Sequence, residues 1–204
     1  MNDRLNHLRD DIRFEASLAG QNLSFNSTWG LFSPREIDEG TQLLLKHVSV
    51  DATDNCLDLG CGYGPIGITL ARLAPQGQTL LVDKDFIAIE YSQKNIEQNR
   101  INNARAMLSN GFDHIDASLR FDLIASNIPA KVGKELLTLI LHDARSRLNP
   151  NGRIYVVTIN GLRQFMKRYL TEIFGNYKKL KQGRQYTVAM ATRVADDGQA
   201  PSKS

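Results

Sequence analysis

The stretch LDLGCGYGPIG, residues 57–67, decides the fold of this chain. An apolar run typical of a strand leads into three alternating glycines, and Pro65 then suits the first turn of a helix. Glycines permit a tight turn and let a ligand approach the backbone closely. The free N–H groups at the start of the helix suit an anionic group. The stretch therefore predicts a strand–loop–helix unit that binds a ligand.

Two acidic residues add to this prediction. Asp58 lies two residues before the first glycine, and Asp83 ends the next apolar run, QTLLVD. A carboxylate in the second place can accept hydrogen bonds from both hydroxyls of a ribose. The pattern indicates a site for an adenosine-containing cofactor at the carboxyl edge of a sheet.

The glycine loop alone leaves three interpretations open. Gly62, Gly64 and Gly67 also satisfy the fingerprint of a dinucleotide-binding loop, and a purely structural turn is the third possibility. The order Asp-x-Gly-x-Gly-x-Gly is the usual form in class I S-adenosylmethionine-dependent methyltransferases. A chain of 204 residues also leaves no room for the separate substrate domain of a dehydrogenase.

The rest of the chain alternates between strand and helix patterns. Strands are expected at residues 56–60, 78–83, 104–109, 121–126 and 152–158, and helices at 65–74, 85–101, 133–148 and 161–174. Two runs at 177–181 and 185–191 should form a hairpin that adds an antiparallel edge strand. Successive strand–helix units predict a mainly parallel sheet covered by helices on both faces.

The segment before the glycine loop contains a hairpin and a helix. Two β-like runs, IRFEASLAG and QNLSFNSTWGLFS, flank a turn at residues 19–22. Ser33, Pro34 and Glu36 have the spacing of a helix N-cap, first position and capping box, so a helix is expected from there to about His47.

Composition restricts the class of protein. The chain is 42% hydrophobic and 23% charged, has no long apolar run, and begins with a polar segment, so we expect a cytoplasmic protein without a membrane span or secretory signal. Cys56 and Cys61 have neither CxxC spacing nor a nearby His, so no metal site is expected.

Positive charge gathers near the C-terminal end. Residues 161–193 hold eight basic side chains and one acidic side chain, a balance of 8 − 1 = +7. This basic C-terminal third suggests a polyanionic partner such as RNA, although a solvated basic face without a partner has the same pattern.

Six segments, in order, resemble the methyltransferase-small-domain family, which includes small-subunit rRNA guanine-N2 methyltransferases and stand-alone relatives. They are LFSPREIDEGTQLLL, LDLGCGYGPIGI, VDKDFIAIEYSQKNI, SNIPAKVGKELL, NPNGRIYVV and FGNYKKLKQGRQYTV, and the resemblance covers residues 13–193. It implies a Rossmann-like class I α/β fold, with a seven-stranded, mainly parallel sheet and an antiparallel last strand. The expected organisation is an N-terminal extension with a small β-hairpin (1–32), the methyltransferase domain (33–193) and a disordered tail (194–204).

The resemblance also implies S-adenosylmethionine as cofactor and a set of residues that bind it. Asn110 stands at the adenine edge, where many relatives have Asp, and Thr41 belongs to a region that closes over the cofactor. The full cofactor-binding set is Asp58, Gly60, Cys61, Gly62, Gly64, Asp83, Lys84, Asn110 and Asn127.

The catalytic signature of the family is Asn-Pro-Pro, often followed by an aromatic residue, and this chain has Asn127, Ile128, Pro129 and Ala130. Asn127 and Pro129 are the expected catalytic residues. The Asn oxygen and a backbone carbonyl would accept the two N–H groups of an exocyclic amine and so expose its lone pair. An ordinary strand-to-helix turn is the alternative interpretation of these residues.

The substrate is expected to contact Trp29, Phe32, Ile128 and Ala130. Because Ala130 replaces the aromatic residue, Trp29, Phe32 or Tyr63 could supply the stacking surface for a base, or could be hydrophobic plugs. The expected substrate is a guanine of rRNA. The expected oligomeric state of the protein is a monomer or a homodimer. A small molecule or protein amide, or a module that binds cofactor or RNA without catalysis, remain as alternatives.

Overall fold

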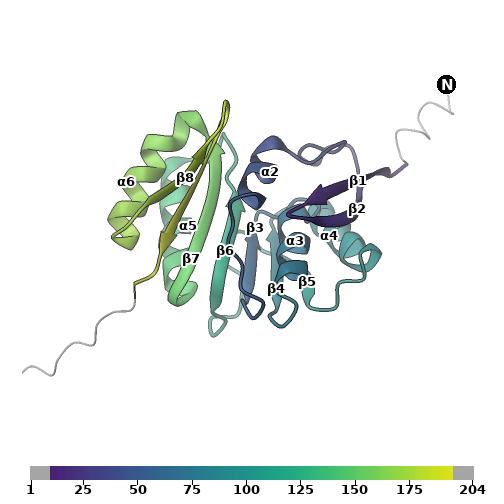
Figure 1. Cartoon of the computed structure of the whole chain (residues 1–204), viewed down its shortest axis with the longest axis horizontal. Coiled ribbons are helices and arrows are strands. Elements are labelled where there is room, and N and C mark those ends of the chain that lie inside the picture. Colours follow the sequence, from purple (N-terminus) through teal and green to yellow (C-terminus); the bar gives the residue numbers. More distant parts are fainter. Residues whose placement is uncertain (1–9, 195–204) are drawn as a thin grey trace, which may run out of the picture.

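The computed structural model describes residues 10–194, and a seven-stranded sheet forms its centre (Figure 1). The strand order is β5-β4-β3-β6-β7-β9-β8, and the first five strands in this order run parallel. This arrangement confirms the predicted Rossmann-like methyltransferase fold. The strands are β3 (Cys56–Leu59), β4 (Thr79–Asp83), β5 (Ala104–Leu108), β6 (Phe121–Asn127), β7 (Leu148–Ile159), β8 (Lys178–Gln182) and β9 (Tyr186–Thr192).

The sequence suggested that the antiparallel strand would lie at the edge of the sheet, but the structure places it one strand further in. β9 is inserted between β7 and β8 and is antiparallel to both. β8, which forms the edge, therefore runs in the same direction as the five parallel strands. Because β9 runs backwards, it begins at the carboxyl edge, where Tyr186 pairs with Ile159.

Helices cover both faces of the sheet because neighbouring strand residues alternate between two cores. Cys56 and Leu81 belong to one core, which also holds apolar side chains of α2 (Glu39–Leu45), α3 (Pro65–Leu73) and α4 (Phe86–Gln98). Leu57 and Leu80 belong to the other core, with α5 (Lys134–Arg147) and α6 (Arg163–Phe174). A 3-10 turn, η1 (Asn160–Leu162), connects β7 to α6.

The predicted N-terminal hairpin is a separate two-stranded sheet, β1 (Ile12–Leu18) and β2 (Gln21–Ser27). Two side-chain amides of α4 attach β2 to the rest of the molecule. Asn95 binds both the N–H (2.7 Å) and the carbonyl (2.8 Å) of Asn26, and Asn99 binds the N–H (3.0 Å) and the carbonyl (2.7 Å) of Ser24. Asn95 and Asn99 lie one helical turn apart on α4. Their side-chain amides bind alternate residues of β2, as the backbone of a neighbouring strand would.

The helix expected after Ser33 begins later than the capping-box pattern indicated. α2 begins at Glu39, and its N-cap is Asp38, whose side chain accepts a hydrogen bond from the N–H of Thr41. Ser33 has a positive φ of 46°, and its hydroxyl donates to the carbonyl of Glu36 instead of accepting an N–H. The hydroxyl of Tyr63 donates to the carbonyls of Ser33 and Glu36, so a tertiary contact holds this segment as a turn.

The predicted disordered tail, residues 194–204, lies outside the described residues except for Val194, as does the start of the N-terminal extension. Within residues 10–194, no helix is long and apolar enough to cross a membrane.

We expect Asn95→Leu to lower the free energy of unfolding by about 2–4 kcal/mol. The variant leaves the N–H and carbonyl of Asn26 and the carbonyl of Tyr63 without the partner that Asn95 provides. Chemical denaturation measures this change. Gln93→Leu, at an exposed position of the same helix, should change stability by less than about 0.5 kcal/mol. Equal effects of the two variants would contradict the role given to Asn95.

Candidate active site

A cavity of about 620 Å³ opens over the carboxyl ends of the parallel strands. Its lining combines the glycine loop after β3, the end of β4, and the SNIPA segment at the end of β6. Most of the predicted site residues meet here. Those that line the cavity are Gly60, Cys61, Gly62, Asp83, Lys84, Asn110, Asn127, Ile128, Pro129, Ala130 and Phe32, together with Thr41.

The glycine loop is held by the carboxylate of Asp83. The N–H of Gly62 donates to Asp83 Oδ2 (2.9 Å), and the N–H of Asp85 donates to Oδ1 (3.0 Å). Gly62 has a φ of 56°, a conformation that side chains with a Cβ rarely adopt. Each oxygen of Asp83 accepts one such bond and keeps a lone pair for a hydroxyl group in the cavity.

Asp58 lies under the loop and outside the cavity lining. Its side chain is fully buried, and Oδ2 accepts a hydrogen bond from the N–H of Gly67 (2.7 Å). Oδ1 is buried with no hydrogen-bond partner among the described residues. Burial raises the pKa of Asp58 to about 7; the Gly67 bond opposes this rise, and the charge of Asp83 adds to it. A buried carboxylate with an unpaired oxygen beside the cavity favours a positively charged ligand.

Gly67 has a packing role, which the third glycine of a dinucleotide-binding loop also has. A Cβ on Gly67 would lie 2.4 Å from Cγ of Leu81, so the glycine allows α3 to pack closely against β4. Gly64, also outside the lining, is the N-cap of α3 with a φ of 96°.

Asn127 lies at the end of β6, and both of its N–H groups are occupied. Nδ2 donates to Asp38 Oδ2 (2.8 Å) and to Thr41 Oγ1 (3.0 Å). Asp38 also accepts the hydroxyl of Tyr186 at Oδ1 (2.9 Å). The amide oxygen of Asn127 is therefore the atom that remains for a substrate, and it can only accept a hydrogen bond.

Sequence reasoning missed Asp38 and Tyr186, and both line the cavity. Asp38 could have been found as a good N-cap directly before the run EGTQLLL, had Ser33 not carried the stronger local signal. Tyr186 carries no local signal, because only the reversed direction of β9 brings it to this edge of the sheet.

The residues expected to contact the substrate take different positions. Phe32 is 65% exposed and lines the cavity together with Leu136 and Ile140 of α5. Pro129 and Ala130 are exposed at the same cavity. Trp29 lies outside the lining, and its ring stacks on the guanidinium of Arg35 at 4.5 Å.

Two other predicted residues have buried side chains. Ile128 packs into the core on the α5 side, and its N–H donates to the carbonyl of Val157 (2.9 Å). Tyr63 belongs to the cavity lining, but it is buried between the hairpin and the turn before α2, with only 3% of its surface exposed, which favours a packing role over stacking on a base.

Cys61 and Asn110, two further residues predicted to bind the cofactor, line the cavity together with Asp83. The thiol of Cys61 is buried, 3.4 Å from Ser92 Oγ. Asn110 donates from Nδ2 to Asp113 (3.2 Å) and keeps its amide oxygen as an acceptor. Within residues 10–194, no group of three or more His, Cys, Asp or Glu side chains could hold a metal ion.

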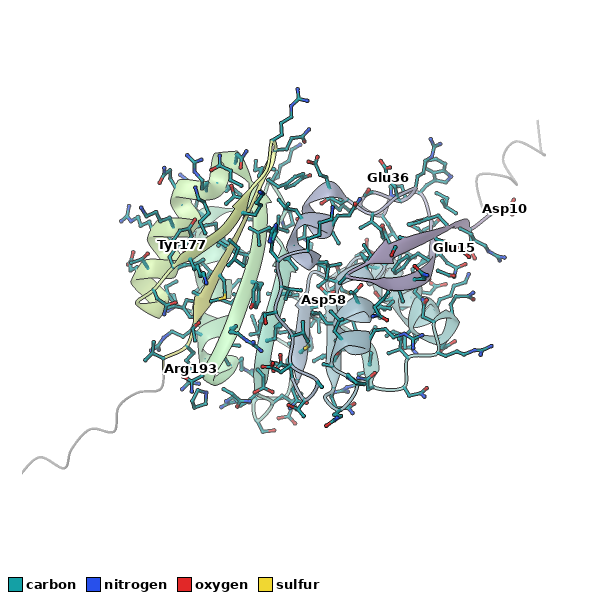
Figure 2. All side chains as sticks on the ribbon, in the orientation of Figure 1. Asp10, Glu15, Glu36, Asp58, Tyr177 and Arg193 are labelled. Atoms are coloured by element: carbon teal, nitrogen blue, oxygen red, sulfur yellow. The ribbon has the colours of Figure 1, made fainter. Side chains whose placement is uncertain are left out.

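The basic C-terminal third does not form one surface. Arg193 follows β9 at the amino edge of the sheet, on the opposite side of the molecule from Glu36 in Figure 2, and it binds the carbonyl of Leu148. Lys178 is also at the amino edge, at the start of β8. Arg184 is exposed in the turn between β8 and β9, two residues before Tyr186 of the cavity. Only part of the positive charge is therefore near the cavity.

Comparisons with known proteins agree with this geometry. The sequence profile of the methyltransferase small domain matches residues 22–190. The uncharacterized protein YbxB of Bacillus subtilis is 29% identical over 87% of this chain and 89% of its own length. Ribosomal RNA small subunit methyltransferase C of Hamiltonella defensa is 34% identical, over 80% of this chain and 48% of that protein.

A solved structure gives the same picture. The 16S rRNA N2 G1207 methyltransferase of T. thermophilus, in complex with AdoMet and guanosine, superposes with a TM-score of 0.81 at 29% identity. The match covers 89% of this chain and 50% of that one, so the chain spans about half the length of the rRNA methyltransferases that it matches. With most of the chain inside the family profile, this protein belongs to the methyltransferase small domain family.

Proposed function

We propose that the chain transfers a methyl group from S-adenosylmethionine to an exocyclic amine, and that the amine is the N2 group of a guanine in small-subunit rRNA. The observation that carries this proposal is the amide of Asn127. Both of its N–H groups are used by Asp38 and Thr41, so it offers only an oxygen acceptor to the cavity that it lines. A substrate must therefore present an N–H or O–H donor there.

The residues of the cavity fit the cofactor. Asp83 has lone pairs for the ribose hydroxyls, and Asn110 has an acceptor for the adenine amine. Buried Asp58, whose Oδ1 has no partner among the described residues, becomes negatively charged when a nearby ammonium or sulfonium group lowers its raised pKa. When bound, S-adenosylmethionine supplies an electrophilic methyl group on a positively charged sulfur.

The chain contributes orientation and electrostatics. Asn127 Oδ1 accepts one N–H of the substrate amine, and the carbonyl of Ile128 accepts the other. These two bonds favour a pyramidal nitrogen whose lone pair is no longer delocalised into the ring. No residue has to act as a strong base, because positioning and charge complementarity carry the step.

The relatives and the cavity rim support RNA as the substrate class. The rRNA methyltransferases that match this chain act on RNA by name, and one was solved with guanosine. Phe32, exposed at the cavity, can stack on a base in place of the aromatic residue that Ala130 replaces. Lys131 at the cavity and Arg184 in the nearby turn can bind phosphates. The proposed rRNA substrate supports the cytoplasmic location that the sequence led us to expect.

A small molecule or a protein amide is the second candidate substrate, because Ala130 leaves no aromatic side chain within the catalytic segment. The dependence of RNA binding on salt distinguishes a small-molecule or protein substrate from an RNA substrate, because only RNA binding should weaken steeply as salt is added.

We expect Asn127→Ala to lower kcat by about 100-fold or more, while the Kd for S-adenosylmethionine changes by less than about 3-fold. The loss concerns an acceptor that orients the substrate amine. Transfer of labelled methyl to small-subunit rRNA measures kcat, and calorimetry measures Kd. Asn102→Ala, at an exposed position outside the cavity, is the control. Equal losses of turnover and cofactor affinity in Asn127→Ala would exclude this role.

Binding of S-adenosylmethionine should release protons at about pH 6.5. In the free protein the pKa of Asp58 is raised to about 7, so much of this carboxyl is protonated at that pH. A nearby cation lowers the pKa and expels the proton. Calorimetry in buffers of different ionisation enthalpy measures the number released. Asp58→Asn should release fewer protons; an unchanged number would show that Asp58 does not sense the cofactor.

Arg184→Ala should weaken RNA binding several-fold at low salt and reduce the slope of log K against log salt by about 1. Lys178→Ala removes one positive charge from the same hairpin, but at the amino edge of the sheet. It should leave the slope nearly unchanged. RNA affinity that is independent of salt in the wild-type protein would favour the small-molecule or protein substrate.

A further inference from the structure

We propose that Asp38 and Tyr186 are positioning residues that hold the amide of Asn127 with its oxygen available to the substrate. This inference rests on the proposed function and extends it to two residues that no sequence motif indicated.

The carboxylate of Asp38 gathers donors from three separate parts of the chain. Oδ2 accepts the N–H of Thr41 (3.1 Å) and Nδ2 of Asn127 (2.8 Å), and Oδ1 accepts the hydroxyl of Tyr186 (2.9 Å). A carboxylate can only accept hydrogen bonds. The side of the Asn127 amide that faces Asp38 must therefore be the NH₂ group, which determines the orientation of the whole amide.

Tyr186 holds the carboxylate from the opposite side. Burial, reinforced by the hydrogen bond to Asp38, raises the pKa of Tyr186 to about 12, so its hydroxyl stays protonated and donates. The ring packs closely against α2: a Cβ on Gly40 would lie 2.8 Å from the ring and from Asp38 Oδ2. The position of Tyr186 is thus fixed by packing as well as by its hydrogen bond.

This arrangement has two consequences for a substrate amine. An amide that turned over would present NH₂ to the substrate N–H, and the two donors would repel each other. An amide that donates to a carboxylate also has more negative charge on its oxygen, since linked hydrogen bonds polarise one another. Asp38 therefore favours the productive orientation and strengthens the acceptor.

A purely structural role of Asp38 is the alternative, because Asp38 is also the N-cap of α2. Asp38→Asn separates the two roles. Asn is as good an N-cap as Asp, but it offers one acceptor oxygen and a competing NH₂ group. Tyr186→Phe is milder still, because it keeps the ring against Gly40 and removes only the hydroxyl.

The test is a double-mutant cycle on methyl transfer to small-subunit rRNA. We expect Tyr186→Phe to lower kcat by about 3–10-fold and Asp38→Asn by about 10–100-fold, with the KM for S-adenosylmethionine changed less than about 2-fold. In the Asn127→Ala background neither change should lower kcat further, because both residues act through Asn127. Effects that multiply fully in that background would overturn the proposal, as would a wild-type kcat in Asp38→Asn.

A second measurement keeps this inference separate from the proposed function. In NMR spectra of ¹⁵N-labelled protein, the side-chain NH₂ of Asn127 should exchange slowly with solvent and should exchange faster in Tyr186→Phe and Asp38→Asn. This readout needs no activity. A wild-type protein that methylates nothing but shows these exchange rates would refute the proposed function and retain the positioning role. Equal exchange in wild type and both variants would refute the positioning role, whatever the activity.

Discussion

Two carboxylates hold the glycine loop in the shape on which the site depends. Asp83 accepts the N–H of Gly62 in the loop, and Asp58 accepts the N–H of Gly67 in the first turn of α3. Acids of neighbouring parallel strands thus fix the loop and the start of the helix that follows it. Asp83 does this at the wall of the cavity, whereas Asp58 does it in the interior with one oxygen unpaired. Under the proposed function, the same two acids would supply negative charge to a cationic cofactor, with Asp58 losing its proton as the cofactor binds.

The side of the cavity that holds Asn127 depends on the reversal of one strand. Since β9 is antiparallel to β7, its first residue, Tyr186, reaches the carboxyl edge, where β6 ends with Asn127. Asp38, at the start of α2, connects the two through its carboxylate. Residues from the beginning, middle and end of the described chain thus form one hydrogen-bonded network, which explains how the last residue of β6 can present a single acceptor.

The chain differs from the Asn-Pro-Pro-aromatic signature at Ile128 and at Ala130. The structure explains the first difference, and the second affects the surface offered to a substrate. Ile128 replaces Pro in a buried place where its N–H donates to Val157, so the backbone is held by a ladder bond that Pro could not make. Ala130 leaves the exposed rim without a ring, and Phe32 supplies an aromatic surface from another segment. Under the proposed function, Asn127 keeps its acceptor oxygen, and Phe32 takes the place of the missing aromatic residue as the stacking surface.

The sequence by itself determined the order of strands and helices, the glycine loop, and the position of Asp83 and Asn127 at the ends of their strands, because periodicity and turn chemistry are local properties. Local reasoning placed the helix start at Ser33 and the antiparallel strand at the edge, and both were wrong. The hydroxyl of Tyr63 and the insertion of β9 decide these features through contacts between distant residues. Only the tertiary structure could show Asp38 beside Tyr186, 148 residues apart, since a hydrogen bond across the fold leaves no pattern in either neighbourhood.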